Sequence, residues 1–270
     1  MIDGEPEFNV CKQIKQLQYL GTESSPVLTN NYQNFQGNDG SIFTSSQFGQ
    51  NVMNVHFKLH VKNYYDYQAK RDEIYNLFMQ KKIFRLRFPE DANHVVFVRP
   101  VGFDINPFQR AGLDCDINIP FENPTGYKFS RYDSLNQSDL WDDYPLGWNV
   151  PIITAEDFHF TDQWAFQLLN PSGIPIDPYG EHHDLKIFMK WIGNRITIVN
   201  KSNGSSYEYR GQGNMNMPVV LDGCETFFNG QQVSYNSDFG NIKLEPGFNK
   251  IQVSGCKHFD ISFKFPFIYV

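Results

Sequence analysis

The clearest pattern in the chain is a strict alternation of apolar and polar residues over positions 53–62. The apolar positions are Met53, Val55, Phe57, Leu59 and Val61. A period of two is typical of a strand with one buried face and one face in water. Related patterns at residues 83–88, 94–105 and 113–121 predict three further strands.

After the first of these strands the period changes from two to about 3.6. Residues 67–82 place one apolar stripe on a single side, formed by Tyr67, Ile74, Leu77, Phe78 and the stem of Lys81. This spacing predicts an amphipathic helix, the only convincing helix that the sequence offers. A lone helix among strands covers an open sheet or plugs the end of a barrel. We therefore expect residues 67–105 to organise the first half of the chain.

Three stretches lack a clear period. Residues 8–20 alternate loosely, as an edge strand or hairpin would. Residues 30–49 are polar and rich in turn formers, so we expect a long loop that is functional or is ordered by a partner. Residues 123–150 are dense in Pro, Gly, Ser and Asp but also hold Trp141 and Trp148. We expect an ordered connection whose aromatic residues pack on a domain or on a neighbouring chain.

The second half reads as many short strands separated by turn signals, which is typical of a β-sandwich. The expected strands are 156–160, 164–169, 185–191, 195–199, 206–210, 217–221, 225–229, 242–244, 249–253 and 258–265. We thus predict a mainly β protein with a first domain at 1–130, a linker at 131–150 and a sandwich at 151–270. Pro266 limits the last strand, about 258–270, to an edge, and this strand stays in the sandwich or returns to the first domain.

Composition narrows the class of protein further. The 270 residues contain 16% aromatic residues, which favours sheets over helical bundles. A net charge of −7 argues against a nucleic-acid-binding face. The first residues show no secretory signal, no stretch is long enough to span a membrane, and the four cysteines have no paired spacing. We expect synthesis in a cytoplasm that keeps the thiols reduced.

Chemistry-bearing residues form no convincing site. His56 and His60 share a strand face, but about 13 Å of strand separates them, too far to hold one metal. His182 and His183 lie in an acidic loop without a third ligand, so a solvated loop is the simpler interpretation. Asp114/Asp116 and Asp142/Asp143 resemble glycosidase pairs only in spacing, and solvated carboxylates explain them better. Nucleophile, nucleotide-binding and zinc motifs are absent from the sequence. We predict no catalytic, metal or cofactor site, and no enzymatic activity.

Four aromatic residues are candidates for binding carbohydrate, because a flat ring suits the apolar face of a pyranose. They are Trp164, Trp191, Tyr207 and Tyr209. Core packing is the alternative, since Trp164 and Trp191 lie in apolar strands.

The order of these features resembles the distal tail protein family of long, flexible, non-contractile phage tails. The segments that carry the resemblance are Gly37–Gly40 with Phe43 and Phe48, the strand at 53–61, Ile74–Phe78, Phe84–Phe88, Val96–Val98 with Val101–Gly102, Asn216–Val220, Leu244–Ile251, Gly255 and Phe259–Ile261. Each motif is an ordinary one alone, and together they cover nearly the whole chain.

The resemblance implies a structural protein of the virion. It implies a split-barrel-like N-terminal domain that assembles as a ring, commonly of six copies, and a C-terminal galectin-like or carbohydrate-module-like sandwich. Such a ring joins the tail tube to the tail-tip protein, and genomic DNA passes through its lumen. Some relatives anchor receptor-binding proteins or bind host saccharide through the C-terminal region. An acidic chain suits that channel, because basic residues would hold the phosphates.

Overall fold

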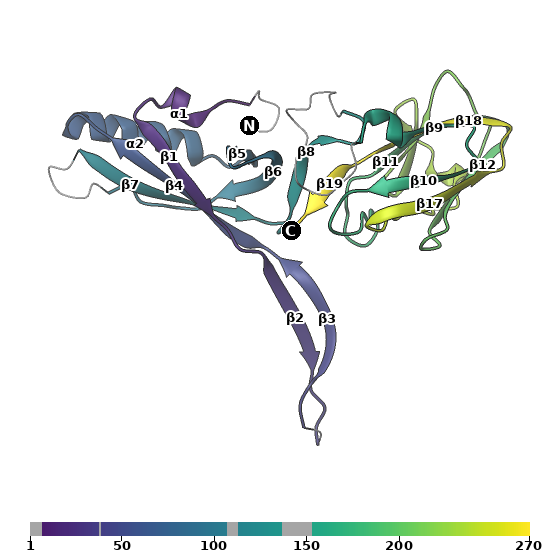
Figure 1. Cartoon of the computed structure of the whole chain (residues 1–270), viewed down its shortest axis with the longest axis horizontal. Coiled ribbons are helices and arrows are strands. Elements are labelled where there is room, and N and C mark those ends of the chain that lie inside the picture. Colours follow the sequence, from purple (N-terminus) through teal and green to yellow (C-terminus); the bar gives the residue numbers. More distant parts are fainter. Residues whose placement is uncertain (1–6, 38, 107–112, 137–152) are drawn as a thin grey trace. The chain divides into compact units, whose positions relative to one another are not determined.

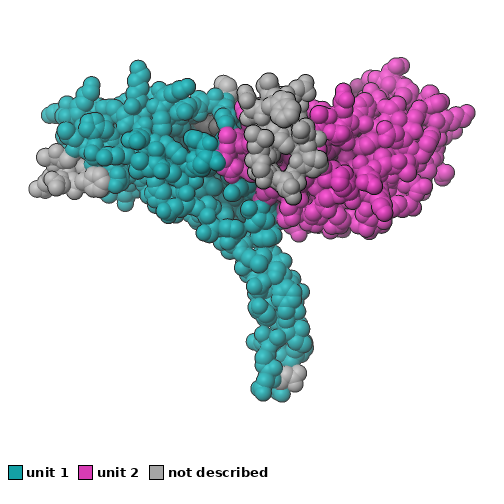
Figure 2. Space-filling model, viewed as in Figure 1, with its two compact units in different colours: residues 1–90, 95–128, 270 teal, residues 91–94, 129–269 magenta. Residues whose placement is uncertain are grey.

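The computed structural model describes residues 7–37, 39–106, 113–136 and 153–270, and these form two compact units (Figures 1 and 2). The first unit comprises residues up to Glu90 and Val95–Lys128, and the second comprises Asp91–His94 and Phe129–Tyr269. The chain is mainly β, as predicted. Residues 131–133 of the expected linker continue strand β8 (Lys128–Asp133), and positions 137–150 lie outside the described residues.

The first unit is built on a sheet that is curled into a half-barrel. Its strands, in spatial order, are β1 (Leu17–Glu23), β4 (Asn51–His60), β7 (Asp114–Asn123) and β6 (Asp91–Pro100), with β5 (Phe84–Phe88) paired to β6. The alternation over 53–61 is confirmed, because β4 is buried at every second residue. Its antiparallel partner β7 matches it in register over all ten residues, from Asn51 opposite Asn123 to His60 opposite Asp114.

Helix α2 (Tyr64–Phe78) covers one face of this sheet (Figure 1). It begins three residues earlier than expected because the side chain of Asn63 accepts the backbone N–H of Asp66 at 2.9 Å and caps the helix. It ends at Phe78, so Lys81 lies beyond the helix and is exposed, which corrects its place in the stripe.

The core of the first unit gathers around the last turn of α2. Phe78 is 3% exposed, and its ring lies 6.2 Å from that of Phe57, 5.9 Å from that of Phe121 and 6.5 Å from that of Phe84. Tyr67 is buried as well, and its hydroxyl donates to the carbonyl of Ile105 at 2.6 Å. The helix is therefore held to the sheet by ring packing and by one buried hydrogen bond.

Two expectations for the first unit are wrong. Residues 8–20 do not form a single strand, since a short helix α1 (Val10–Gln13), capped by Asn9, precedes β1. Residues 30–49 are not a loop. They form most of a long antiparallel hairpin of β2 (Val27–Gln33) and β3 (Ile42–Gly49), which continues the β1–β4 pair away from the sheet (Figure 1).

The second unit contains two antiparallel sheets. The four-stranded sheet has the order β10 (Ala165–Asn170), β17 (Gly247–Ser254), β12 (Arg195–Asn200) and β13 (Ser206–Arg210). The six-stranded sheet has the order β16 (Gln231–Gln232), β15 (Glu225–Phe228), β14 (Val219–Asp222), β11 (Lys186–Ile192), β18 (His258–Lys264) and β9 (His159–Thr161). Each predicted strand in this half corresponds to an observed strand within a few residues, except 156–160, which is mostly the 3-10 turn η2 (Ala155–Phe158), and 242–244, which holds an isolated bridge.

Aromatic rings fill the space between these two sheets. Phe160 of β9 stacks on Phe166 of β10 with ring centroids 3.7 Å apart, and Phe263 of β18 contacts both rings. Trp191 of β11 meets Tyr209 of β13 at 5.5 Å. The rings link strands of opposite sheets, so this part of the unit is a β-sandwich.

The final segment does not continue β18 as one strand. Ser134 interrupts it, because its hydroxyl donates to the carbonyl of Phe263 at 2.6 Å and accepts the N–H of Phe265 at 3.1 Å. The last strand, β19 (Pro266–Tyr269), then pairs with β8 instead of a sandwich strand.

Candidate assembly interface

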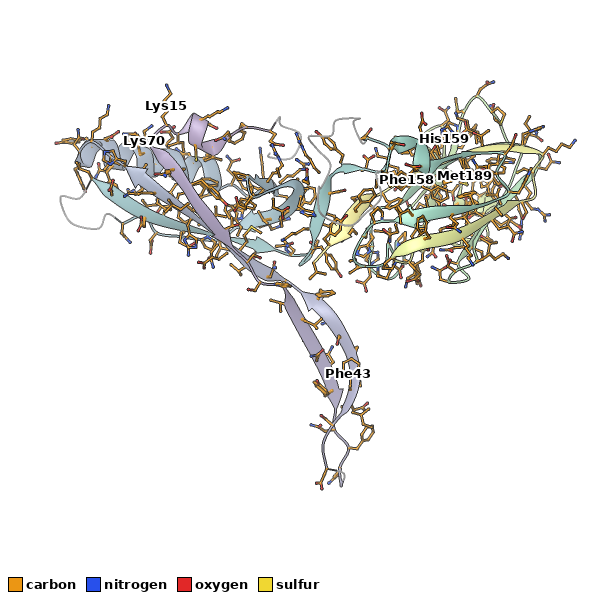
Figure 3. All side chains as sticks on the ribbon, in the orientation of Figure 1. Lys15, Phe43, Lys70, Phe158, His159 and Met189 are labelled. Atoms are coloured by element: carbon orange, nitrogen blue, oxygen red, sulfur yellow. The ribbon has the colours of Figure 1, made fainter. Side chains whose placement is uncertain are left out.

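The hairpin of β2 and β3 is the most exposed regular structure in the described part of the chain. Every residue of β2 is exposed, as is every residue of β3 except Gly49. The exposed large hydrophobic residues are Val27, Leu28, Tyr32, Phe35, Ile42, Phe43 and Phe48. Figure 3 shows the side chain of Phe43 standing on this hairpin, away from the sheet. Exposed large hydrophobic residues in such number on one ribbon favour an interaction with a partner.

The interior of the hairpin is held by its own hydrogen bonds. The amide of Asn31 donates to the Ser45 hydroxyl at 3.2 Å, and the Thr44 hydroxyl donates to the carbonyl of Asn31 at 2.9 Å. The rings of Tyr32 and Phe43 meet edge to face at 5.9 Å. A two-stranded ribbon is marginally stable by itself in water, so the exposed apolar surface is available for a partner to cover.

The base of the hairpin is fixed to the body of the first unit. Gly126 has φ +72°, and a Cβ there would lie 2.5 Å from the carbonyl oxygen of Gly49, so only glycine allows this approach. The side chain of Asn123 accepts the Gly126 N–H at 3.2 Å, and Phe48 packs against Tyr127 at 5.8 Å. The hairpin therefore leaves the sheet in a defined direction at its root.

Charge is nearly absent from the hairpin. Asp39 is the single charged residue between Ser24 and Gln50. A surface with many amides and hydroxyls and almost no charge avoids the cost of desolvating ions when it is buried. This composition fits a protein–protein contact better than contact with a polyanion.

The wet face of the sheet carries several ion pairs. Asp114 pairs with His60 at 2.6 Å and with Lys58 at 3.0 Å, and these contacts, with His60 first, lower the pKa of the carboxyl group. A glycosidase acid needs a raised pKa, so Asp114 does not suit that role. His56 contacts Glu23 instead, so the two histidines of this face have separate partners.

The remaining candidate residues for chemistry are also spread apart. His182 is exposed, whereas His183 is buried, and burial lowers the pKa of the His183 imidazole. Within the described residues no group of three or more His, Cys, Asp or Glu side chains is arranged to hold a metal ion. All four cysteines are free thiols. Asp142 and Asp143 lie outside the described residues.

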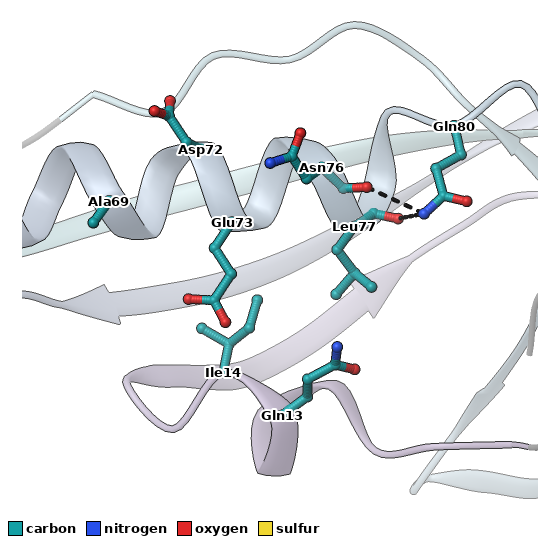
Figure 4. A pocket seen from close by; sticks show the side chains of 8 residues that line it. All are labelled: Gln13, Ile14, Ala69, Asp72, Glu73, Asn76, Leu77 and Gln80. Carbon is teal, nitrogen blue, oxygen red and sulfur yellow. Dashed lines mark hydrogen bonds between the residues drawn. The ribbon is translucent and has the colours of Figure 1, made fainter.

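A shallow groove of about 520 Å³ lies between α1 and α2 (Figure 4). It is lined by Gln13, Ile14, Ala69, Asp72, Glu73, Asn76, Leu77 and Gln80. Glu73 is paired with Lys70 at 2.6 Å, and the Gln80 amide donates to the carbonyls of Asn76 and Leu77 at 3.1 Å. These polar groups serve the helix itself, and the groove holds no pair of a nucleophile and a base.

The predicted carbohydrate platform does not form as a unit. Trp191 and Tyr207 are fully buried and Tyr209 is 6% exposed, so these rings pack in the sandwich core and cannot stack on a sugar at the surface. The Tyr207 hydroxyl lies 2.8 Å from the Thr226 hydroxyl, and burial raises the pKa of Tyr207. Trp164 alone is exposed, at 42%, with Phe259 at 5.1 Å behind it.

The sequence predicts that residues 30–49 are functional or ordered by a partner, but it does not predict that they form a hairpin. The turn signal at Gly37–Gly40 was present, and Ile42 and Phe43 follow it. Both faces of the ribbon are wet, so neither strand shows the alternation that predicts a half-buried strand. The near absence of charge over such a long polar stretch is the feature of the sequence that indicates an interaction surface.

Comparison with known proteins agrees with these observations. Residues 8–123 match the family model of the phage tail protein RIFT-related domain. The structure of the Dit protein of phage SPP1, described as a paradigm of the hub adsorption apparatus in phages that infect Gram-positive bacteria, is similar at a TM-score of 0.67. It is 11% identical, and the match covers 94% of this chain and 95% of that one.

Two further comparisons add little. A chain of the phage p2 baseplate in its activated conformation with Sr is 9% identical over 93% of this chain and 90% of that chain, and its TM-score of 0.42 is too low to support an argument. No curated protein matches the sequence. No helix in the described residues is long and apolar enough to cross a bilayer.

Residues 8–123 therefore match the phage tail RIFT-related domain, and the curled sheet of the first unit lies within this part of the chain. The chain as a whole has a fold similar to that of the SPP1 Dit protein, and both findings agree with the resemblance to siphophage distal tail proteins expected from the sequence.

Proposed function

We propose that this protein forms a ring, of six copies, at the distal end of a siphophage tail. In this proposal the ring joins the tail tube to the tail-tip protein and anchors host-adhesion components such as a receptor-binding protein. The ring is assembled in the host cytoplasm, and genomic DNA passes through its lumen without specific binding. The protein has no catalytic role.

The exposed hairpin carries this proposal. It presents seven large hydrophobic residues, almost no charge and two unpaired strand edges, all of which favour burial against another chain. A hairpin that contacts a different surface of the next copy makes a head-to-tail interface, and such an interface closes into a ring when the rotation per subunit allows it. A second copy of the chain is therefore the partner that the ring requires.

Mass photometry of the purified protein at micromolar concentration tests the ring. We expect a dominant species of six chains. The combined variant Tyr32→Ser, Ile42→Ser and Phe43→Ser should shift the population to monomers, because it removes exposed apolar surface from the hairpin. Tyr65→Ser is the matched control, since Tyr65 is 82% exposed at the start of α2 and lies outside the hairpin.

Two outcomes would contradict the proposal. One is a wild-type protein that stays monomeric throughout the concentration series. The other is a ring that survives the triple hairpin variant and is lost in Tyr65→Ser.

Binding of a host cell-wall saccharide is the second candidate function, and one observation favours it. Trp164 is the predicted platform residue that the sandwich leaves exposed, and an exposed indole is well suited to stack on a pyranose. A glycan array probed with the wild type and with Trp164→Ala tests this function. Binding that is lost in Trp164→Ala would support it, and absence of binding in the wild type would exclude it for the sugars on the array.

A further inference from the structure

Two loops of the sandwich meet at the tight turn between β14 and β15. Pro178, in the loop that follows residue 176, lies 4.0 Å from the position that a Cβ on Gly223 would occupy. On the other side, the amide of Asn241 donates to Cys224 Sγ at 3.8 Å. Segments 177–181 and 234–241 therefore flank one turn, although they are far apart in the sequence.

Each of these segments exposes large aromatic side chains. Tyr179 and Tyr235 are each 74% exposed and Phe239 is 71% exposed. We call these three residues the loop cluster. They are the most exposed large hydrophobic residues in the second unit among the described residues. Three exposed rings on two segments that flank one turn are unusual for a surface without a partner.

The loop that carries Tyr179 is fixed by a carboxylate. Asp177 accepts the N–H of Tyr179 at 3.1 Å and that of Gly180 at 2.8 Å, and it pairs with Lys243 at 3.3 Å. Tyr235 follows Ser234, whose hydroxyl accepts the N–H of Thr226 at 2.9 Å. Both rings therefore stand on backbone that is already ordered, which lowers the entropy cost of binding.

Phe239 is held in a conformation that disfavours side chains. Its φ is +59°, a region that glycine adopts freely and a bulky residue adopts at a cost. The Ser237 hydroxyl accepts the Phe239 N–H at 3.1 Å, and the Asp238 carboxylate accepts the N–H groups of Glu208 and Gly240 at 3.0 and 2.9 Å. The structure thus accepts local strain to present an exposed ring, which points to a role outside folding.

The carboxylates near the loop cluster outnumber the cations, although Arg210, which pairs with Glu208, also interacts electrostatically with Asp238. The carboxylates of Glu181, Asp184, Glu225 and Asp238 are exposed, and none of them forms an ion pair with a cation in the described residues. The lysines of the same segments are already used, because Lys186 pairs with Asp222 at 2.6 Å and Lys243 pairs with Asp177. The surface therefore combines exposed ring faces with an excess of negative charge.

We propose that the loop cluster is a docking surface for a protein partner that presents arginine and lysine side chains. A guanidinium group stacks on the face of Tyr or Phe and at the same time pairs with a neighbouring carboxylate. The proposal does not depend on ring assembly, because every residue that it uses belongs to the second unit. It assigns to the sandwich a partner site that is separate from the hairpin.

Fluorescence anisotropy with two labelled peptides tests the proposal on the full chain. Both peptides are of about 15 residues with the same spacing of serines, and one carries arginines where the other carries glutamates. We expect the arginine peptide to bind at least about tenfold more tightly, and we expect this binding to weaken as salt is added.

The next variants leave the net charge of the protein unchanged. They therefore distinguish a specific binding site from general electrostatic attraction to an acidic protein. Tyr179→Ser with Phe239→Gly should weaken binding of the arginine peptide by about tenfold. Phe239→Gly relieves the positive φ, so the melting temperature should stay equal or rise, and loss of binding cannot be attributed to unfolding. Phe248→Ser is the matched control, because Phe248 is 61% exposed on the outer face of β17.

The proposal is overturned if the double variant binds the arginine peptide as the wild type does, or if Phe248→Ser weakens binding equally. It is also overturned if both peptides bind alike, or if the double variant loses binding to a glycan array instead.

Discussion

The hairpin of the first unit and the outer strand of the four-stranded sheet in the second unit treat their strand edges in opposite ways. Strand β13 is covered by residues of its own chain, since Ser206 bridges to Asn241 and Tyr209 bridges to Ser237. Gly240 makes this cover possible, because a Cβ there would lie 2.2 Å from the carbonyl oxygen of Ser206. Strands β2 and β3 pair with each other and with no further strand of the described chain.

This difference distinguishes strand edges that are covered within the fold from strand edges that are open to another chain. An open edge invites another chain, and natural proteins normally block it with charge, proline or a covering loop. The sandwich blocks β13 with residues 237–241. The hairpin has no such block and almost no charge, so its open edges are a feature that the proposed ring would use.

The first prediction measures how much free energy of unfolding is lost when a buried side chain is truncated. The losses at the two strand edges can then be compared with this value. Phe78→Ala should lower the free energy of unfolding of the first unit by ~3–5 kcal/mol, because it removes a ring that packs against three others in the core. Leu77→Ala should cost about 1–2 kcal/mol, since that side chain is only partly buried. Urea denaturation measures both variants, and equal losses would show that the two positions share one environment.

The second prediction removes the cover of β13. Gly240→Val should cost about 2–4 kcal/mol, because the new Cβ meets backbone and must displace segment 237–241. The exposed β13 should also promote association, which light scattering during refolding detects. Gly173→Val is the control, since nothing lies within 4 Å of a Cβ at that exposed position. A Gly240→Val variant that is as stable as Gly173→Val would mean that the cover contributes nothing to the fold.

The third prediction concerns the hairpin as part of a monomer. Tyr32→Ser, Ile42→Ser and Phe43→Ser together should change the free energy of unfolding of the monomer by less than about 0.5 kcal/mol, because surface positions away from packing rarely matter more. Urea denaturation at a concentration too low for assembly measures this. A loss comparable to that of Phe78→Ala would show that the hairpin apolar residues pack within their own chain.

The same contrast explains how far the sequence could predict the fold. The strand at 53–61, the helix near 67–78 and most sandwich strands were predicted because burial on one side leaves a periodic pattern. The hairpin has no buried side, so its strands were read as a loop. The period of apolar residues in a sequence indicates which side chains are buried within the same chain. It does not indicate which surfaces a partner covers.

The site was harder to predict than the fold for a related reason. Three of the four aromatic candidates proved to be core residues, since strands of a sandwich bury large rings as readily as they expose them. Phe239 and Tyr179 gave no signal in the sequence, because exposure in a loop depends on hydrogen bonds to distant residues such as Lys243 and Glu208. Helix α2 began early because capping by Asn63 overrode the apolar period.

The last prediction, with the smallest expected effect, concerns pH. It compares the hairpin with the body of the first unit. The hairpin has one charged side chain, Asp39, whereas Asp66 in the body of the first unit accepts the Lys62 N–H at 2.8 Å and the Gln16 amide at 2.7 Å. These bonds, the Lys62 N–H first, lower the pKa of Asp66 below its ordinary value. Stability from this carboxylate is therefore complete above the unfolded pKa of about 3.9 and is lost as the pH falls through the lower folded pKa.

Asp66→Asn should accordingly flatten the acid limb of the stability curve of the first unit, measured by urea denaturation at a series of pH values from about 5 to 2. Gln16→Ala removes one of the two donors and should give an intermediate slope. The hairpin contact, measured as the assembled fraction between about pH 8 and 5, should stay constant, because the hairpin carries a single carboxylate and no histidine, lysine or arginine. An assembled fraction that changed steeply there would mean that titratable groups outside the hairpin take part in the contact, and the uncharged ribbon would then be only part of the interface.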